Sequence, residues 1–206
     1  MNKKKNNGVT YLFQFSTNNI VKVGMLSAVA FILMLIQFPI PTIFPFFLEL
    51  DISELPALLG GFALGPVAGT IIVLLKNLLL LVVRGTKTSY VGELSNFIVG
   101  SAFVVPASII YLHNRTKKGA MYSLITGIFG MTIVAILSNY YLIVPLYSKA
   151  LGFEEVMNMA SKANGAIVDM KTYILYAVLP FNILKSAIVS IFTLLIYKRL
   201  SPVLRK

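Results

Sequence analysis

The stretch LPALLGGFALGPVAGTIIVLLKNLLLLVV, residues 55–83, holds 29 residues and a single charged side chain. A transmembrane helix needs about 20 predominantly apolar residues to cross ~30 Å of hydrocarbon at 1.5 Å per residue. The stretch is too long for one such helix, and Gly65 and Pro66 near its middle break helices. We therefore predict two short helices joined by a tight turn near these two residues, at 55–69 and 70–83.

The composition of the whole chain indicates an all-α integral membrane protein. Of the 206 residues, 57% are hydrophobic and only 12% are charged, whereas soluble domains carry about 25% charged residues. The absence of cysteine excludes disulfides and thiolate metal sites. The net charge of +11 would suggest a nucleic-acid partner in a soluble protein, but here the positive-inside rule explains it. We therefore expect a lipid bilayer around the chain and no nucleic acid.

Four further apolar segments lie at 22–40, 93–112, 121–146 and 173–198. With the two short helices they make six predicted transmembrane helices, so both termini lie on the same side of the membrane. The start of the chain is basic and then polar, without a cleavage site after an apolar region, which indicates a retained tail rather than a signal peptide. We therefore expect a cytoplasmic N-terminal tail, a single six-helix membrane domain and a cytoplasmic C-terminal tail, at residues 1–20, 21–200 and 201–206.

The distribution of basic residues orients the predicted helices. If both termini are inside, the inner segments hold eleven of the eighteen basic residues, namely Lys3, Lys4, Lys5, Lys22, Arg115, Lys117, Lys118, Lys198, Arg199, Arg205 and Lys206. The outer loops hold five, Arg84, Lys87, Lys149, Lys162 and Lys171. Cytoplasmic loops carry the excess of lysine and arginine, so the predicted orientation is N-in and C-in. All the acidic residues then fall outside or at an outer helix end.

Strongly polar residues gather in the outer half of four predicted helices. Asn182 and Lys185 lie nine to twelve residues into the last helix, a depth of roughly 14–18 Å at 1.5 Å per residue. The others are Lys76 and Asn77 in the third helix, Glu93 and Asn96 at the outer end of the fourth, and Asn139 in the fifth. The inner halves hold almost none. This distribution predicts a binding pocket that is open to the exterior and closed to the cytoplasm.

The first outer loop, PIPTIFPFFLELDISEL at 39–55, combines prolines and aromatic side chains with the acids Glu49 and Asp51. Two interpretations stay open for its phenylalanines. They cap the predicted pocket, or they lie in the membrane interface.

Two pairs of polar residues share helix faces. Asn182 and Lys185 are three residues apart, and so are Glu93 and Asn96. In the structural alternative, Glu93 or backbone carbonyls freed near Pro180 neutralise the lysines, and the asparagines cross-link helices. Since two intramembrane lysines face at most one well-placed acid, and ionisable residues within a membrane mark functional sites, a binding role is favoured. Amide and ammonium donors among apolar walls suit a flat heteroaromatic ligand with one polar edge.

Motifs for catalysis are missing from the sequence. The single histidine, His113, stands at an inner helix end, and no metal-ligand cluster or HExxH motif is present. No GxxxxGK[ST] phosphate-binding loop occurs. We therefore expect no enzyme and no cofactor, and uphill transport would take its energy from a partner or a gradient.

Three segments carry a resemblance to a known family: LELDISELPALLGGFALGPVAGTIIVLLKNLL at 48–79, GELSNFIVG at 92–100 and PFNILK at 180–185. They resemble the substrate-binding S components of energy-coupling-factor (ECF) vitamin transporters, over about residues 21–196. The first two segments are shared across that family. PFNILK, with an asparagine late in the fifth helix, is similar to the riboflavin-specific type, and the absence of tryptophan argues against the thiamine and biotin types.

The resemblance implies a high-affinity riboflavin-binding subunit in the cell membrane. Asn139, Asn182 and Lys185 would hydrogen-bond the isoalloxazine ring, with Lys185 donating to a neutral vitamin rather than pairing with a carboxylate. For the acids of the first loop, the resemblance implies that Glu49, Asp51 or Glu54 contacts or gates the ligand. Glu93 and Asn96 are expected to lie at the same site.

The resemblance also implies partners. These are a transmembrane scaffold subunit and two cytoplasmic ATPase subunits, which drive the loaded subunit to topple in the membrane. Gly24 and Ala28 on the first helix form a small-xxx-small motif that would dock the scaffold, or would pack against another helix of the same chain. Two rival functions stay open: an S component for another flat vitamin or flavin analogue, and a small intramembrane enzyme or assembly factor that uses Lys185 with Glu93.

Overall fold

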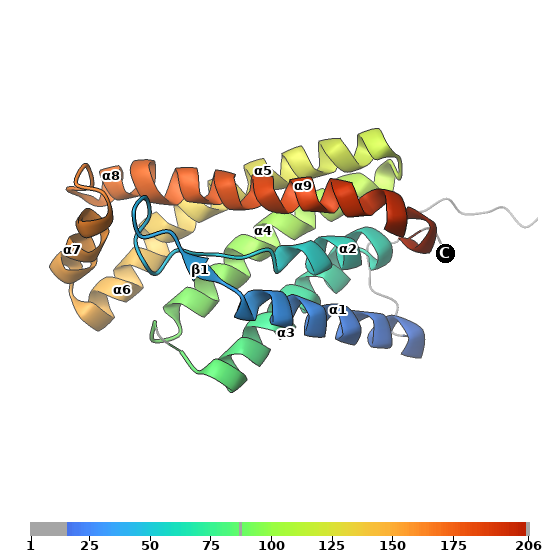
Figure 1. Cartoon of the computed structure of the whole chain (residues 1–206), viewed down its shortest axis with the longest axis horizontal. Helices are drawn as coiled ribbons and strands as arrows, with labels where there is room; N and C mark the ends of the chain where they lie inside the picture. Colours follow the sequence, from blue (N-terminus) through green and yellow to red (C-terminus); the bar gives the residue numbers. More distant parts are fainter. Residues whose placement is uncertain (1–15, 87, 205–206) are drawn as a thin grey trace, which may run out of the picture.

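The structure is a computed structural model that describes residues 16–86 and 88–204, without the side chains of 150–151 and 198–204. The chain forms a bundle of helices that run roughly along the long axis of the molecule (Figure 1). The long helices are α1 (Thr17–Leu35), α3 (Pro66–Arg84), α4 (Val91–His113), α5 (Lys117–Ser138) and α9 (Leu179–Leu204). The shorter elements are β1 (Phe38–Pro39), β2 (Glu49–Leu50), α2 (Glu54–Leu64), α6 (Val144–Leu151), α7 (Phe153–Ala163), α8 (Met170–Tyr173) and the π-helical segments η1 (Asn139–Ile143) and η2 (Ile174–Val178).

Five helical stretches are long and apolar enough to cross a membrane, at 17–35, 66–84, 91–113, 117–149 and 170–197. The helix α2 has 11 residues, which reach only about 16 Å at 1.5 Å per residue. The all-α membrane architecture is therefore confirmed. Within the described residues, five helical stretches have spanning length and α2 is a shorter apolar helix, where six spans were expected.

The break between α2 and α3 falls where the sequence predicts it. Gly65 takes a φ of 100°, in the left-handed region that favours glycine, and Pro66 is the first residue of α3. Because α3 begins at Pro66 rather than at residue 70, it has 19 residues and is long enough to span the membrane, unlike the short helix that we expected. Gly69 lets α2 lie close to α3, since a Cβ atom there would stand 3.0 Å from the carbonyl oxygen of Ala57.

The two π-helical segments both precede a proline by two residues. The segment η1 is followed by Val144 and Pro145, and η2 by Leu179 and Pro180. A proline has no N–H group and its ring clashes with the carbonyl four residues earlier, which a π-helical turn relieves by widening the helix. The widened turns keep α5–α6 and α8–α9 continuous, so each of these rods counts as one spanning stretch.

The two ends of the bundle carry different loops and helix ends. The start of α1, the α2–α3 turn, the α4–α5 connection and the end of α9 lie toward one end in Figure 1. The loop with β1, the α3–α4 connection, α6 and α7 lie toward the other end. The strands β1 and β2 pair antiparallel, with Phe38 opposite Leu50. The connection between the predicted helices at 121–146 and 173–198 contains α7, which buries Val156, Met157 and Ala160.

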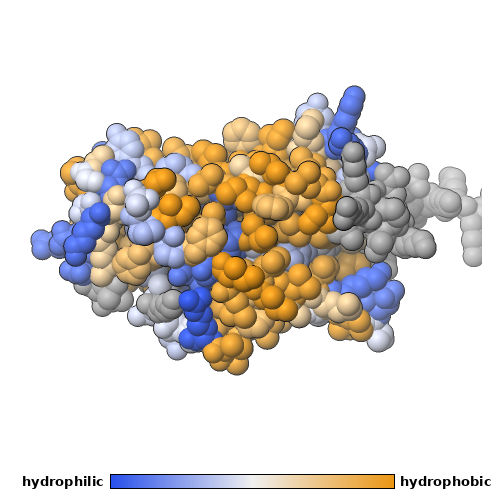
Figure 2. Space-filling model, in the orientation of Figure 1, coloured by the Kyte–Doolittle hydropathy of each residue, from blue (hydrophilic) through white to orange (hydrophobic). Residues whose placement is uncertain are grey.

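The middle of the molecule presents an apolar surface. Figure 2 shows hydrophobic residues across the central part of the visible face and hydrophilic residues toward its ends. Exposed large apolar side chains occur on several helices and include Ile32 of α1, Val82 of α3, Phe129 of α5 and Leu195 of α9. A soluble monomer rarely exposes such contiguous apolar area, so this surface faces lipid.

The first loop folds over the bundle. Phe44 is 3% exposed and packs edge-on against Phe181 of α9, with ring centroids 5.3 Å apart. Phe47 approaches Tyr147 and Tyr173 at 5.8 and 6.4 Å between ring centroids. Phe44 and Phe47 therefore pack against the bundle, whereas Phe46 is 55% exposed. Of the three phenylalanines, Phe46 and Phe47 line the cavity described below, in line with the capping interpretation, and Phe44 does not.

Candidate ligand-binding site

A cavity of about 300 Å³ lies between the first loop and the helices at the end that carries α6 and α7. Its volume is at the lower limit of small-molecule sites, about 300–1,000 Å³. Its apolar and aromatic lining includes Met34, Phe46, Phe47, Leu48, Leu80, Val99, Met131, Ile143, Tyr147, Tyr173 and Phe181. Its polar lining includes Gln37, Glu49, Arg84, Thr88, Glu93, Ser95, Asn96, Asn139, Asn182 and Lys185.

The structure brings together most of the residues that the sequence singled out. Those that line the cavity are Glu49, Glu93, Asn96, Asn139, Asn182 and Lys185. Asp51 does not belong to the lining but contacts Lys185, and Lys76 is buried outside it. Sequence reasoning missed Arg84, Tyr147, Tyr173 and Phe181, although Phe181 directly precedes Asn182 in the predicted last helix.

Asn139 and Asn182 are positioned in the same way. The Nδ2 atom of Asn139 donates to the carbonyl oxygen of Ala135 at 2.9 Å, and that of Asn182 donates to Val178 at 2.8 Å. Each bond spans one turn of the residue's own helix and uses one of the two N–H groups of the amide. Each side chain is 5% exposed. Each fixed amide keeps a second donor and a carbonyl oxygen for a ligand.

Asn77 makes the same kind of bond as these two residues but lies outside the cavity lining. Its Nδ2 atom donates to the carbonyl oxygen of Val73 within α3, 2.7 Å away, and Asn77 does not line the cavity. The structural alternative has the asparagines cross-link helices, but the bonds of Asn77, Asn139 and Asn182 each stay within one helical rod.

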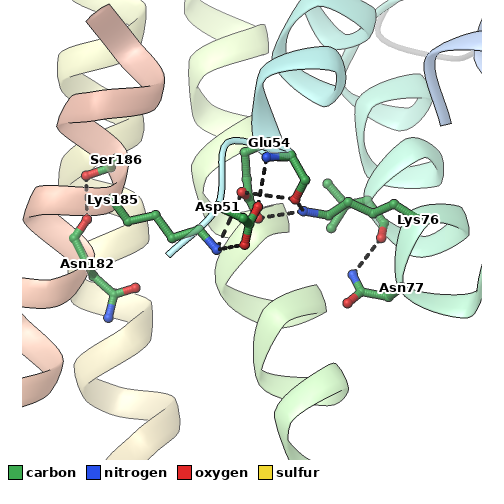
Figure 3. A network of polar contacts seen from close by, with 9 residues as sticks. Asp51, Glu54, Lys76, Asn77, Asn182, Lys185 and Ser186 are labelled. Atoms are coloured by element: carbon green, nitrogen blue, oxygen red, sulfur yellow. Dashed lines mark hydrogen bonds and ion pairs between the residues drawn. The ribbon is translucent and has the colours of Figure 1, made fainter. Parts of the chain in front are cut away.

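The buried lysines contact two carboxylates. The Nζ atom of Lys185 lies 2.8 Å from Oδ2 of Asp51 and 3.6 Å from Oε2 of Glu54. The Nζ atom of Lys76 lies 2.7 Å from Oε1 of Glu54 and donates to the hydroxyl of Ser53. Figure 3 shows the two lysines reaching the carboxylates from opposite sides, Lys185 from α9 and Lys76 from α3. We call these five residues the charge cluster.

The charge cluster corrects four expectations. The lysines face two acids rather than at most one, and Asp51 and Glu54 lie inside the bundle rather than in an outer segment. Lys185 is paired with a carboxylate, contrary to the expectation that it is a donor reserved for a neutral ligand. Glu93 contacts neither lysine, since its Oε2 atom accepts from Thr86 at 3.2 Å and from Thr88 at 3.1 Å. The first loop, which was expected to lie outside the membrane domain, therefore enters it.

Gly24 and Ala28 lie on an exposed face of α1. No atom stands within 4 Å of a Cβ atom built on Gly24, and Ala28 is exposed. Val21, Met25 and Val29 on the same helix are 52%, 66% and 48% exposed. The alternative in which the two small residues pack against another helix of this chain is therefore wrong for the part of the chain that the structure describes.

The fold and the cavity define a class: a helical membrane protein that encloses a small-molecule site near one end of its bundle. The family model for the substrate-specific component of ECF transporters matches residues 18–197. The chain belongs to this family. It is a transport subunit and not an enzyme, so the enzymatic alternative is set aside.

Named relatives and a solved structure are similar to the chain over nearly its full length. The riboflavin transporter RibU of Staphylococcus aureus is 40% identical over 205 residues, 97% of this chain and 99% of the relative. The riboflavin transporter FmnP of Bacillus subtilis is 34% identical, covering 89% of this chain and 92% of the relative. A structure described as the S component of a bacterial ECF transporter is 35% identical, with a TM-score of 0.71, and covers 92% of this chain and 98% of that one.

Proposed function

We propose that this protein is the high-affinity riboflavin-binding subunit of an ECF-type, ATP-driven uptake transporter in the cell membrane. The names of the relatives in Staphylococcus aureus and Bacillus subtilis support riboflavin as the ligand. The observation that carries the proposal is the placement of two fixed amides and one ammonium group in a single cavity that is also lined by aromatic side chains.

The chemistry of this cavity suits riboflavin. The pyrimidine edge of the isoalloxazine ring alternates carbonyl acceptors with an N–H donor, and an asparagine amide offers the complementary donor and acceptor. Asn139 and Asn182 would bind this edge, with Lys185 donating to a carbonyl oxygen. The hydroxyl groups of the ribityl chain would meet the polar residues of the lining, such as Glu49, Glu93 and Asn96. Asp51 would act through Lys185 rather than by direct contact.

The ring faces of the flavin need apolar or aromatic partners. Phe47, Tyr147 and Tyr173 lie close together on the side of the cavity formed by the first loop, α8 and the α5–α6 rod. Large aromatic side chains contribute buried area and prefer offset or edge-on contacts with another ring. These residues would sandwich or flank the isoalloxazine system.

The proposal includes six membrane helices in the N-in, C-in orientation, with α2 as the shortest. It is supported by the clustering of the start of α1, the α4–α5 connection and the end of α9 toward one end (Figure 1). The α4–α5 connection carries Arg115, Lys117 and Lys118, and lysine and arginine favour the cytoplasmic side. The cavity would then open to the exterior.

The partners would be the transmembrane scaffold and two cytoplasmic ATPase subunits of an ECF transporter. Membership of the family supports this assembly. The exposed face of α1 around Gly24 and Ala28 would dock the scaffold, because small residues four positions apart allow another helix to approach closely. The division into one membrane domain at 21–200 with short cytoplasmic tails belongs to the same proposal, and most of the N-terminal tail lies outside the described residues.

Equilibrium binding tests the ligand. The full-length protein purified in detergent is expected to quench riboflavin fluorescence with a stoichiometry of one. Other flat vitamins and flavin analogues serve as competitors. Failure to bind riboflavin, together with tight binding of one of these compounds, would support the alternative ligand and refute the flavin assignment.

A further inference from the structure

The charge cluster lies against the cavity, yet Lys185 is its one member in the cavity lining. Asp51, Ser53, Glu54 and Lys76 are between 0% and 4% exposed. Direct contact with a ligand therefore does not explain these four residues.

The charges within the cluster balance. Its two ammonium groups and two carboxylates sum to zero, and each carboxylate has a lysine within 2.8 Å. In a low-dielectric interior an unpaired charge costs several kcal/mol, and a pair is tolerated only where its geometry and hydrogen bonds are good. The cavity therefore meets an ammonium group whose charge is already compensated.

The position of Lys185 is set by the segment between β2 and α2. The backbone N–H of Ser53 donates to Oδ1 of Asp51 at 2.8 Å, which leaves Oδ2 to accept from Lys185 at 2.8 Å. Glu54 is held by Lys76 through one oxygen and faces Lys185 with the other. The ammonium group of Lys185 is thus fixed by two carboxylates that are themselves fixed (Figure 3).

We propose that Asp51, Glu54 and Lys76 are positioning and specificity-determining residues: they hold Lys185 at the cavity wall and keep this wall electrically neutral, so that it selects a neutral ligand edge over an anionic one. The proposal rests on the riboflavin-binding function. It differs from that function in assigning the preference for a neutral ring to residues that do not touch the ligand.

The midpoint potential of bound riboflavin depends on the charge of the cavity wall around Lys185. The oxidised ring of riboflavin is neutral, whereas its two-electron reduced ring readily loses a proton and becomes an anion at mildly alkaline pH. The midpoint potential of bound riboflavin therefore measures the ratio of the dissociation constants for the two forms. A tenfold change in this ratio shifts the potential of a two-electron couple by about 30 mV.

Three variants change the net charge in a controlled way. Asp51→Asn leaves one surplus positive charge and is expected to raise the potential relative to the unmodified protein. Lys76→Met leaves one surplus negative charge and is expected to lower it, by less because Asp51 contacts Lys185 directly, whereas Lys76 contacts Glu54 and Ser53 on the far side of the cluster. The double variant Asp51→Asn/Lys76→Met is neutral and is expected to return the potential toward that of the unmodified protein.

Ser53→Ala is the matched control, because it removes a hydrogen-bonding group from the cluster without changing its charge. It is expected to lower stability and to leave the potential unchanged. The proposal is overturned if Asp51→Asn and Lys76→Met shift the potential in the same direction. It is also overturned if neither shifts it while riboflavin still binds, or if Ser53→Ala shifts it equally.

Size-exclusion chromatography covers the case in which the single variants do not fold. If the neutral double variant then elutes as a monodisperse protein, the requirement for charge balance is supported. If the double variant also does not fold, the proposal is overturned. Failure of the unmodified protein to bind riboflavin is a separate outcome that refutes the proposed function.

Discussion

The ammonium group of Lys185 lies 2.8 Å from the carboxylate of Asp51, although 134 residues separate the two in the chain. This contact joins α9 to the segment that leads from the first loop into α2. Lys185 is 5% exposed and Asp51 is 4% exposed, so water screens neither charge effectively. The contact therefore links the stability of the bundle to the geometry of its binding site.

Breaking this pair from one side is expected to destabilise the protein. Lys185→Met leaves Asp51 without its nearest cation, and the loss of one partner of a buried pair costs about 3–5 kcal/mol. Thermal unfolding of the detergent-solubilised protein measures the effect. The double variant Lys185→Met/Asp51→Asn is expected to be more stable than Lys185→Met alone. Lys162→Met on the exposed surface of α7 is the control, with a change within about 0.5 kcal/mol.

The two asparagines of the cavity are expected to be required for affinity. Asn139→Leu and Asn182→Leu each replace an amide by an apolar side chain of similar size. Each change should weaken riboflavin binding by about 10- to 100-fold, because leaving a buried polar group of the ligand without a hydrogen bond costs about 1–3 kcal/mol. Fluorescence quenching measures the dissociation constants. Asn77→Leu is the matched control, since Asn77 is buried but lies outside the lining. An equal loss of affinity in this control would contradict the assigned roles.

The exposed face of α1 is expected to serve transport and not binding. Gly24→Leu or Ala28→Leu would block close approach of a partner helix, so riboflavin uptake in cells should be lost while the purified subunit binds riboflavin normally. Val82→Leu is the control, because Val82 is 82% exposed on a different helix, α3. Normal uptake by both α1 variants would count against docking at this face.

Gly69 is expected to tolerate no side chain. In Gly69→Ala the new Cβ would lie 2.4 Å from Cγ1 of Val104 and 3.0 Å from the carbonyl oxygen of Ala57, and overpacking of this kind costs about 1–3 kcal/mol. A lower melting temperature of the solubilised protein would show it. Gly24→Ala is the matched control, because nothing stands within 4 Å of the added methyl group. Equal melting temperatures for the two variants would contradict the predicted close packing of α2 and α3.

Several features of this protein could be predicted from local sequence. The apolar segments predicted membrane helices, and Gly65 with Pro66 predicted the break between α2 and α3. The spacing of Asn182 and Lys185 predicted that they share a helix face, and both line the cavity. These predictions succeed because helix geometry depends only on neighbouring residues.

The length of α3 and the partners of the two lysines could not be predicted from local sequence. The start of α3 at Pro66 depends on where α2 ends, and the short α2 packs against α3 and α4 rather than spanning alone. Glu93 was the nearest acid by predicted depth, but Thr86 and Thr88 engage it. Predicted depth orders residues along the membrane normal and carries no information on their arrangement around the bundle.

The sequence by itself determined that this chain is a helical membrane protein, where its helices break and which polar residues lie at similar depth. Tertiary structure alone decided which of them meet. Asp51 and Glu54 belong to a segment that looks like an outer loop, and they become buried because the first loop folds over the bundle and leads into the short helix α2. Two lysines from α3 and α9 balance their charges there, since apolar surroundings favour ions only in compensated groups.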